Sequence, residues 1–282
     1  MKITLGVVVF GTKYLDVMLE SLINQTDSDF DLILRDQEEN TYSAYAYISK
    51  NYPKIKIKKG KNLFHSGGHD HLALECSGDY YIIGSQDMYY PANFIENLKK
   101  ELQKNKKYQV FAPCIKRFDY PHGLTEFIDS YGIKVDRLLR FKSIGFGEKV
   151  NDFKPPMFTD GPDGALMIFK KTAIAKITEK DGMFLDPEIH YKNDCELALR
   201  LKKMHLRCKI LPDLFVFHDR QAVNFKKKSF NLVKSSFIGE GIILHKHLKW
   251  NFEYFNPIFT SIYHLLKRIY LVIKYPSLWK NL

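Results

Sequence analysis

The sequence has few cysteines and no long apolar run. Four of its 282 residues are cysteines, and they show neither C-x-x-C spacing nor a dense disulfide framework, so we expect a reducing, cytoplasmic environment. No apolar stretch reaches about 18 residues, which argues against a membrane-spanning helix. The first segment, ITLGVVVF, lacks a small-residue cleavage site, so we expect no secretory signal. The cysteines are Cys76, Cys114, Cys195 and Cys208.

Motifs for two common classes of ligand are also missing. No G-x-G-x-x-G follows the first apolar segment, which disfavours a dinucleotide-dependent oxidoreductase. The aromatic-basic strand motif of RNA-binding domains is absent as well. The net charge is +11, but residues 226–282 hold ten basic and two acidic side chains, which leaves +3 for residues 1–225. We therefore expect a nearly neutral folded body, a basic tail and no nucleic-acid partner.

Apolar segments of strand length alternate with helical patterns along residues 1–225. Residues 3–10 predict a buried strand, 14–24 an amphipathic helix and 31–36 a second strand. Such a strand–helix–strand unit predicts a parallel sheet that binds ligands at the carboxyl ends of its strands. Residues 116–160 are polar and poorly periodic, and we expect a long excursion over the active face. Further strands are predicted at 54–60, 80–84, 109–115, 165–169 and 208–218, and further helices at 41–50 and 195–204.

Two aspartates follow predicted strands. Asp36 ends the second strand, where a carboxylate can accept a hydrogen bond from a base or ribose, although a turn aspartate is an equally simple explanation. Asp87 comes shortly after the buried strand at 80–84, where a carboxylate can hold a divalent cation together with phosphate oxygens. An ordinary loop aspartate is the alternative there too.

The segment HSGGHDH at residues 65–71 combines histidines with two glycines. His69 and His71 are two positions apart and we expect no helix at this point, so a zinc site is disfavoured. A glycine loop that lets the backbone approach a phosphate fits the segment better.

Further candidates lie at the ends of later elements. Asp194 and Glu196 begin a predicted helix, where the helix dipole favours carboxylates. Asp194 could instead point into the cleft as a general base. His218 ends a strand, where it could contact a metal or phosphate or serve no special role.

The order of these segments resembles that of inverting family 2 glycosyltransferases, over about residues 3–220. The opening VVVFGTKYLDVMLESLINQTDSDFDLILRD is similar to their nucleotide-binding strand, helix and Asp-terminated strand. The block NLFHSGGHDHLALECSGDYYIIGSQD is similar to their glycine loop, helix and DxD-type motif. The segments DGPDGALMIFKKTAI and GMFLDPEIHYKNDCELALRLKKMHLRCKILPDLFVFH are similar to the acceptor block of the rhamnosyltransferase-like branch.

This resemblance implies a GT-A fold, that is, one Rossmann-like α/β domain with a mixed, mainly parallel central sheet. It also implies Mn²⁺- or Mg²⁺-dependent transfer, with inversion, from a dTDP- or UDP-sugar to a glycan or lipid-linked acceptor in cell-surface polysaccharide synthesis, with dTDP-rhamnose as the expected donor. The implied site consists of Phe10, Gly11, Asp36, Gly68 and His69 at the nucleotide sugar, Asp87 and His218 at the metal, Asp194 as catalytic base, and Asp163, Gly164 and Glu196 near the acceptor.

Several positions depart from the family pattern. Ser85 replaces the first acidic or Asn residue of the DxD-type motif, and Asn193 replaces the Glu of the Glu-Asp pair before the helix. Phe10-Gly11 stands where Tyr-Asn is common. These changes leave the base in place, but they keep a UDP-hexose or UDP-galactofuranose donor open. They also leave open a catalytically silent sugar-nucleotide-binding scaffold.

The tail contains an amphipathic helical pattern within residues 258–274. Its apolar side chains recur at helical spacing, opposite His264, Lys267 and Lys274. Such a helix can lie on an anionic membrane, here at the inner face of the cell membrane, or pack on the domain or on a second subunit of a homodimer. We expect residues 1–225 to form the glycosyltransferase domain and 226–282 a basic helical extension. The apolar positions are Ile258, Ile262, Leu265, Leu266, Ile269, Val272 and Ile273.

Overall fold

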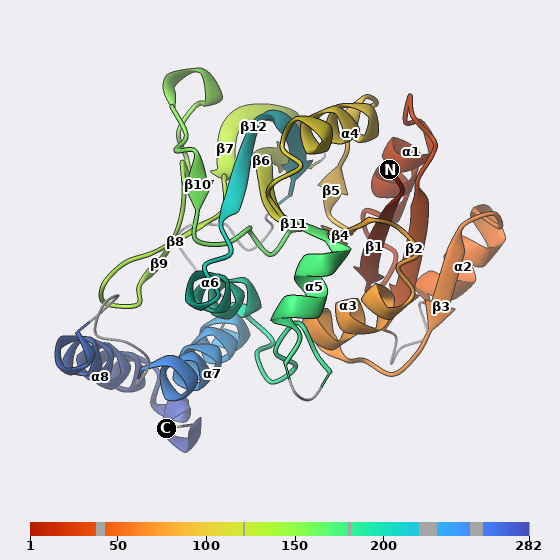
Figure 1. The fold of residues 1–282 in the computed structure, drawn as a ribbon. Helices are drawn as coiled ribbons and strands as arrows, with labels where there is room; N and C mark the ends of the chain where they lie inside the picture. The colour runs from red at the N-terminus through yellow and green to blue at the C-terminus, as the bar shows by residue number, and fades with distance from the viewer. Residues whose placement is uncertain (38–42, 121, 180–181, 220–229, 249–255, 282) are drawn as a thin grey trace.

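The computed structural model describes residues 1–37, 43–120, 122–179, 182–219, 230–248 and 256–281. Its main feature is a mixed sheet with the strand order β10-β12-β6-β11-β4-β1-β2-β3, in which β5 also pairs with β12 and β7 with β6 (Figure 1). The strands are β1 (Ile3–Val9), β2 (Asp31–Asp36), β3 (Lys56–Lys59), β4 (Tyr80–Ser85), β5 (Met88–Tyr89), β6 (Val110–Asp119), β7 (Gly123–Ser130), β10 (Phe158–Thr159), β11 (Leu166–Lys170) and β12 (Cys208–His218). A separate hairpin is formed by β8 (Ile133–Val135) and β9 (Phe141–Ser143).

Two helical layers cover this sheet. On one face, α1 (Leu15–Ile23), α2 (Ala44–Asn51) and α4 (Phe94–Lys104) contribute apolar side chains to one core cluster. On the other face, α3 (Phe64–Leu74), α5 (Lys171–Ile177) and α6 (Asn193–Lys203) contribute to a second. β1 is buried on both faces, which is why its sequence reads as one continuous apolar run. The predicted α/β fold with a mixed, mainly parallel sheet is confirmed.

Strand direction brings several chain segments to one edge of the sheet. β1 runs parallel to β2 and β4, and β12 runs parallel to β6. β11 is antiparallel to both of its neighbours, β4 and β6. The carboxyl ends of β1, β2, β4 and β12 and the amino end of β11 therefore lie along the same edge.

The predicted glycine loop at 65–71 is wrong, because these residues lie inside α3. A Cβ atom on Gly68 would come within 2.7 Å of the Val8 side chain and of the Gln37 amide. The glycines therefore let the helix approach β1 closely, and burial against the sheet outweighs their low helix propensity.

The predicted excursion over residues 116–160 is also more ordered than expected. It contains the end of β6, β7, the β8–β9 hairpin, a short 3-10 helix (Val150–Asp152) and β10. Gly123, Gly132 and Gly145 adopt positive φ angles at turns between these pieces, which breaks the sequence into segments too short for a clear period. The predicted strands and helices outside this region are confirmed within a few residues.

The tail is helical, as expected. α7 (Phe230–His247) packs against α6 and places Ile243 in a small core with β8 and α6, and α8 (Pro257–Lys274) follows beside it, before a final 3-10 turn (Pro276–Asn281) (Figure 1). The expected boundary at residue 225 lies outside the described residues. In the described part of the chain, no helix is both long and apolar enough to cross a bilayer.

Candidate active site at the carboxyl edge of the sheet

His218 and two carboxylates form the centre of the site. β5 pairs with β12 so that Met88 lies opposite His218, which brings the preceding residue, Asp87, next to the imidazole. The Nε2 atom of His218 is 3.4 Å from Oδ1 of Asp87, and its Nδ1–H donates a 3.0 Å hydrogen bond to the fully buried carboxylate of Asp129 on β7. Burial lowers the pKa of His218, but the charge of Asp87 and the bond to Asp129 outweigh it and raise this pKa to about 10.

Tyr14 and Gln86 fasten the loop after β1 to this centre. The Tyr14 hydroxyl donates a 2.6 Å hydrogen bond to Asp219, the residue after His218. The Gln86 amide group accepts from the Phe10 N–H at 2.5 Å and donates to the carbonyl oxygens of Phe10 and Lys13 at 3.2 and 2.9 Å. The turn that carries Asp87 and the loop that carries Phe10 are thus held as one unit.

Asp194 lies at the amino end of α6, against the amino end of β11. Its Oδ2 atom accepts a 3.1 Å hydrogen bond from the Gly164 N–H, and Oδ1 accepts from its neighbour Cys195. A Cβ atom on Gly164 would lie 3.4 Å from this carboxylate, so the residue is small where the acid approaches. Burial, followed by the charge of Asp163, raises the pKa of Asp194 above the usual range of an aspartate. A carboxylate of raised pKa is a stronger base than an exposed one.

His65, on α3, pairs with Asn193, the residue before Asp194. The side-chain N–H of Asn193 donates a 2.8 Å hydrogen bond to Nδ1 of His65. Burial lowers the pKa of this histidine to about 4, so the ring is neutral and Nδ1 can accept. The charge of Asp87 acts in the opposite sense and raises this pKa, but burial outweighs it. Asn193, the residue before Asp194, therefore forms a hydrogen bond with a neutral His65, and neither partner carries a charge.

Asp36, Phe10 and Gly11 lie at the ends of β2 and β1, as predicted. The Asp36 carboxylate is fully buried and accepts hydrogen bonds from the Tyr45 N–H at 2.8 Å and the Ser43 hydroxyl at 3.1 Å. Phe10 is 57% exposed, and Gly11 adopts a φ of +68° with no atom near its missing Cβ. Exposed apolar surface beside an open glycine offers room for a flat ring.

Three predicted site residues are directed elsewhere. Gly68 packs against β1, and the His69 ring is buried with Nδ1 3.0 Å from the Tyr81 hydroxyl. The Glu196 carboxylate is buried and accepts hydrogen bonds from Arg200 at 2.8 and 2.9 Å and from His247 at 3.0 Å. Gly68 and His69 serve the packing of α3, and the Glu196 side chain stabilises α6, so we leave these residues out of the candidate site.

The residues present fit a divalent cation with two protein ligands. Among the described residues, no group of three His, Cys, Asp or Glu side chains could hold a metal. Asp87 offers a carboxylate oxygen and His218 an imidazole nitrogen at the same point, and Asp129 occupies the other imidazole nitrogen, as carboxylates do beside metal-binding histidines. The remaining ligands would be phosphate oxygens and water, as is usual for Mg²⁺ or Mn²⁺ at a nucleotide.

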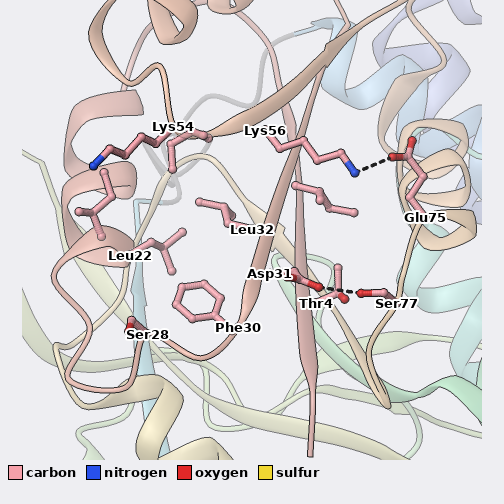
Figure 2. Close-up of a pocket in the computed structure, with 13 residues that line it drawn as sticks. Thr4, Leu22, Ser28, Phe30, Asp31, Leu32, Lys54, Lys56, Glu75 and Ser77 are labelled. Atoms are coloured by element: carbon pink, nitrogen blue, oxygen red, sulfur yellow. Dashed lines mark hydrogen bonds and ion pairs between the residues drawn. The ribbon is translucent and has the colours of Figure 1, made fainter.

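A shallow pocket of about 450 Å³ lies elsewhere (Figure 2). Thr4, Asp31 and Lys56 line it at the amino ends of β1, β2 and β3, the edge opposite to the carboxylates described above. Its polar groups pair with one another: Ser77 donates to Asp31 at 2.7 Å, and Lys56 lies 3.5 Å from Glu75. This pocket is therefore not part of the candidate site.

Sequence reasoning missed four residues of the site. Asp129 lies in the region 116–160, which the sequence predicts as an irregular excursion, and His65 lies in a helix that the sequence predicts as a loop. Tyr14 adopts a left-handed conformation just before α1, and Gln86 lies in the turn after β4. Only Gln86, two positions after the strand that precedes Asp87, carried a positional signal.

Solved structures with a similar fold include S. aureus TarS 1–349, with a TM-score of 0.57 at 12% identity, covering 88% of this chain and 66% of that one. The same fragment in complex with UDP has a TM-score of 0.55 at 12% identity, with the same coverage. The mannosyltransferase PcManGT from Pyrobaculum calidifontis, in complex with GDP-Man and Mn²⁺, has a TM-score of 0.59 at 14% identity and covers 93% and 68%. This chain thus spans about two thirds of these structures, and 44% of a longer TarS chain.

The sequence itself adds a family assignment. A comparison with curated proteins finds no match. The glycosyl transferase family 2 profile, however, matches residues 6–173, more than half of the chain. This range includes the loop after β1, Asp36, Asp87 and the amino end of β11. The chain therefore belongs to glycosyl transferase family 2.

Proposed function

We propose that this protein transfers a sugar from a nucleoside-diphosphate sugar to a hydroxyl group with inversion of configuration. The observation that carries the proposal is the placement of two kinds of group along one edge of the sheet: Asp87 and His218, 3.4 Å apart, follow β4 and end β12, and Asp194 accepts a hydrogen bond from Gly164 at the amino end of β11. A carboxylate and imidazole suited to a cation-bound diphosphate and a carboxylate suited to proton removal thereby share one edge of the sheet.

Asp194 is the proposed general base. Its partly buried carboxylate, with a raised pKa, accepts the proton of an acceptor hydroxyl while that oxygen attacks the anomeric carbon. The bond to the nucleoside diphosphate breaks as the new bond forms on the opposite face of the sugar. The hydrogen bonds from Gly164 and Cys195 fix the direction of the carboxylate, so that one oxygen is oriented before the acceptor arrives.

Asp87 and His218 would hold Mn²⁺ or Mg²⁺, which would neutralise the charge of the departing diphosphate when bound. Asp129 keeps Nε2 of His218 directed toward Asp87. The exposed Phe10 ring, the open Gly11 and the Asp36 region would receive the nucleotide base and ribose. Tyr14 and Gln86 hold that pocket against the turn that carries Asp87.

dTDP-rhamnose is the proposed donor, and a glycan or lipid-linked hydroxyl in cell-surface polysaccharide synthesis is the proposed acceptor. The likeness of residues 160–218 to the acceptor block of the rhamnosyltransferase-like branch supports this choice. A UDP-hexose or UDP-galactofuranose donor is the alternative within the same chemistry, since Phe10-Gly11 and Ser85 depart from the family pattern. A sugar-nucleotide-binding scaffold without catalytic activity is the alternative to a glycosyltransferase.

Calorimetric titration tests the donor site. We expect dTDP, UDP or GDP to bind with Mn²⁺, and the Asp87→Ala variant to lose the metal-dependent part of the affinity. Asp79→Ala, at an aspartate just before β4 and outside the site, is the matched control. Equal affinity with and without Mn²⁺ in the wild-type protein would contradict the assignment of Asp87. Rhamnose transfer from dTDP-rhamnose, compared with UDP-galactose, then decides between donors.

A further inference from the structure

α8 exposes its apolar side and buries its polar side. Ile258, Leu266 and Ile273 are 66%, 62% and 74% exposed. At 100° per residue, the exposed apolar positions fall within an arc of about 140° on the helix. They form one continuous, solvent-exposed stripe on α8, a helix that lies well away from the sheet (Figure 1). The stripe consists of Ile258, Phe259, Ile262, Leu265, Leu266, Ile269, Tyr270 and Ile273.

Polar contacts hold the opposite side of α8 on the body. His264 is buried and its Nε2–H donates a 2.8 Å hydrogen bond to the Leu138 carbonyl, and the Thr260 hydroxyl donates to the Arg137 carbonyl at 3.3 Å. Lys267 donates to both carboxylate oxygens of Glu240 on α7 at 2.7 and 2.9 Å. The helix cannot turn its apolar stripe inward without breaking these contacts. Its outward orientation is therefore built into the fold.

The charges around the stripe have one sign. Residues 256–282 contain no Asp or Glu, whereas Lys274 and Lys280 are exposed. Trp279 is 69% and Tyr270 60% exposed, and both ring types favour the boundary between lipid and water. Stripe-to-stripe pairing of two copies would bring these like charges together, whereas an anionic surface would complement them.

We propose that α8 and the following turn dock on an anionic lipid bilayer, with the stripe in the headgroup–acyl boundary and the lysines at lipid phosphates. Such helices lie in the plane of the interface and bind through buried apolar area together with charge. Docking fixes one face of the protein toward the membrane. The inference goes beyond the proposed sugar transfer and stands without it.

Co-sedimentation of the full chain with vesicles tests the apolar contact. We expect the wild-type protein to bind phosphatidylcholine vesicles that contain 30% phosphatidylglycerol. The double variant Leu265→Gln/Ile269→Gln should bind the same vesicles at least about tenfold more weakly than wild type. The matched control, Ile23→Gln/Leu74→Gln, changes two exposed apolar residues elsewhere and should bind like wild type. Circular dichroism confirms that each variant is folded. Unchanged binding of the α8 variant would overturn the proposal.

A second arm tests the charges and the rival occupant. Lys274→Glu/Lys280→Glu alters only exposed side chains, so folding should be unaffected, and we expect about tenfold weaker binding to anionic vesicles. Weak binding to pure phosphatidylcholine and a loss of binding at high salt would agree with this. Equal binding to both lipids would overturn the proposal. A dimer that the Leu265→Gln/Ile269→Gln variant dissociates, with no vesicle binding, would identify a second copy as the occupant instead.

Discussion

The Nδ1 atom of His218 lies 3.0 Å from a carboxylate oxygen of Asp129, and this contact joins the end of β12 to the interior of β7. Because Nδ1 is occupied, only Nε2 is left for a ligand beside Asp87. We expect Asp129→Asn to weaken Mn²⁺ binding in the presence of nucleoside diphosphate by about 10- to 100-fold, the usual cost of losing such a partner. Electron paramagnetic resonance of free Mn²⁺ measures this directly.

Asp119→Asn is the matched control for this prediction. Asp119 lies at the exposed end of the neighbouring strand β6, so its substitution changes the same charge without touching His218. An Asp129 variant that is folded and binds Mn²⁺ as tightly as the control would show that the histidine needs no partner to act as a ligand.

Asp163 contributes to the raised pKa of the proposed base, Asp194, after burial. Burial and the charge of Asp163 raise the pKa of Asp194, so its basic form is lost at a higher pH than that of an ordinary aspartate. Removal of the neighbouring charge lowers this pKa again. Asp163→Asn should therefore move the acid limb of the kcat/KM profile to lower pH, and Asp152→Asn, at an exposed aspartate, should leave it in place. If the acid limb of the Asp163→Asn profile stays at the wild-type pH, the charge of Asp163 does not influence the pKa of the base.

Gln86 makes three hydrogen bonds to the loop after β1, which forms part of the proposed donor site. In Gln86→Leu this loop loses its fixed position, while Asp194 and its partners keep theirs. We expect the KM for the donor to rise about five- to 100-fold with a smaller change in kcat, because the variant loses up to three bonds of about 1 kcal/mol each. Gln103→Leu, on the exposed side of α4, is the control. A fall in kcat alone would place Gln86 in the chemical step.

Glu240 links the tail to the segment before the base. It forms ion pairs with Lys267 on α8 and with Lys192, two residues before Asp194. Burial raises the pKa of Glu240, but the two lysines outweigh this and lower it to about 2. Since the folded pKa is below that of the unfolded chain, the stabilisation is complete above about pH 4.5 and is lost as the pH falls toward 2.

Glu240→Gln should accordingly lower the free energy of unfolding at pH 7 by about 3 kcal/mol. The difference from wild type should shrink as the pH falls below 4.5. Urea unfolding at several pH values measures it, with the exposed Glu188→Gln as control. A difference that is constant down to pH 3 would mean that the charge of Glu240 does not contribute.

The sheet and most of its helices could be predicted because their apolar periods are long and uninterrupted. β1, α1 and β2 follow directly from the alternation of a buried run, a helical stripe and a second buried run. α3 could not be predicted, because its glycines and polar residues disfavour a helix. Its close packing on β1, which Gly68 permits, is not visible in the local sequence. The strands between 116 and 160 are short, and glycine turns hide their period.

The positions of the candidate residues could be predicted where they depend on the end of a strand or helix. Asp36, Asp87 and His218 lie at strand ends, and Asp194 begins a helix, as the sequence indicated. Asp129 is different, because a buried aspartate inside a strand has no local signal, and only the pairing of β6 with both β7 and β12 brings it to His218. The outward orientation of the α8 stripe likewise depends on the Leu138 carbonyl and on Glu240, which bind His264 and Lys267 of α8 from other parts of the chain.

Nucleoside diphosphate release from dTDP-, UDP- and GDP-sugars with Mn²⁺, in wild type and Asp194→Asn, tests the central claim most directly. We predict release from at least one donor by the wild-type protein, a rate about 10²- to 10⁴-fold lower in Asp194→Asn, and unchanged nucleotide affinity in that variant. Release at equal rates by both proteins, or by neither with any donor although both are folded, would contradict the account.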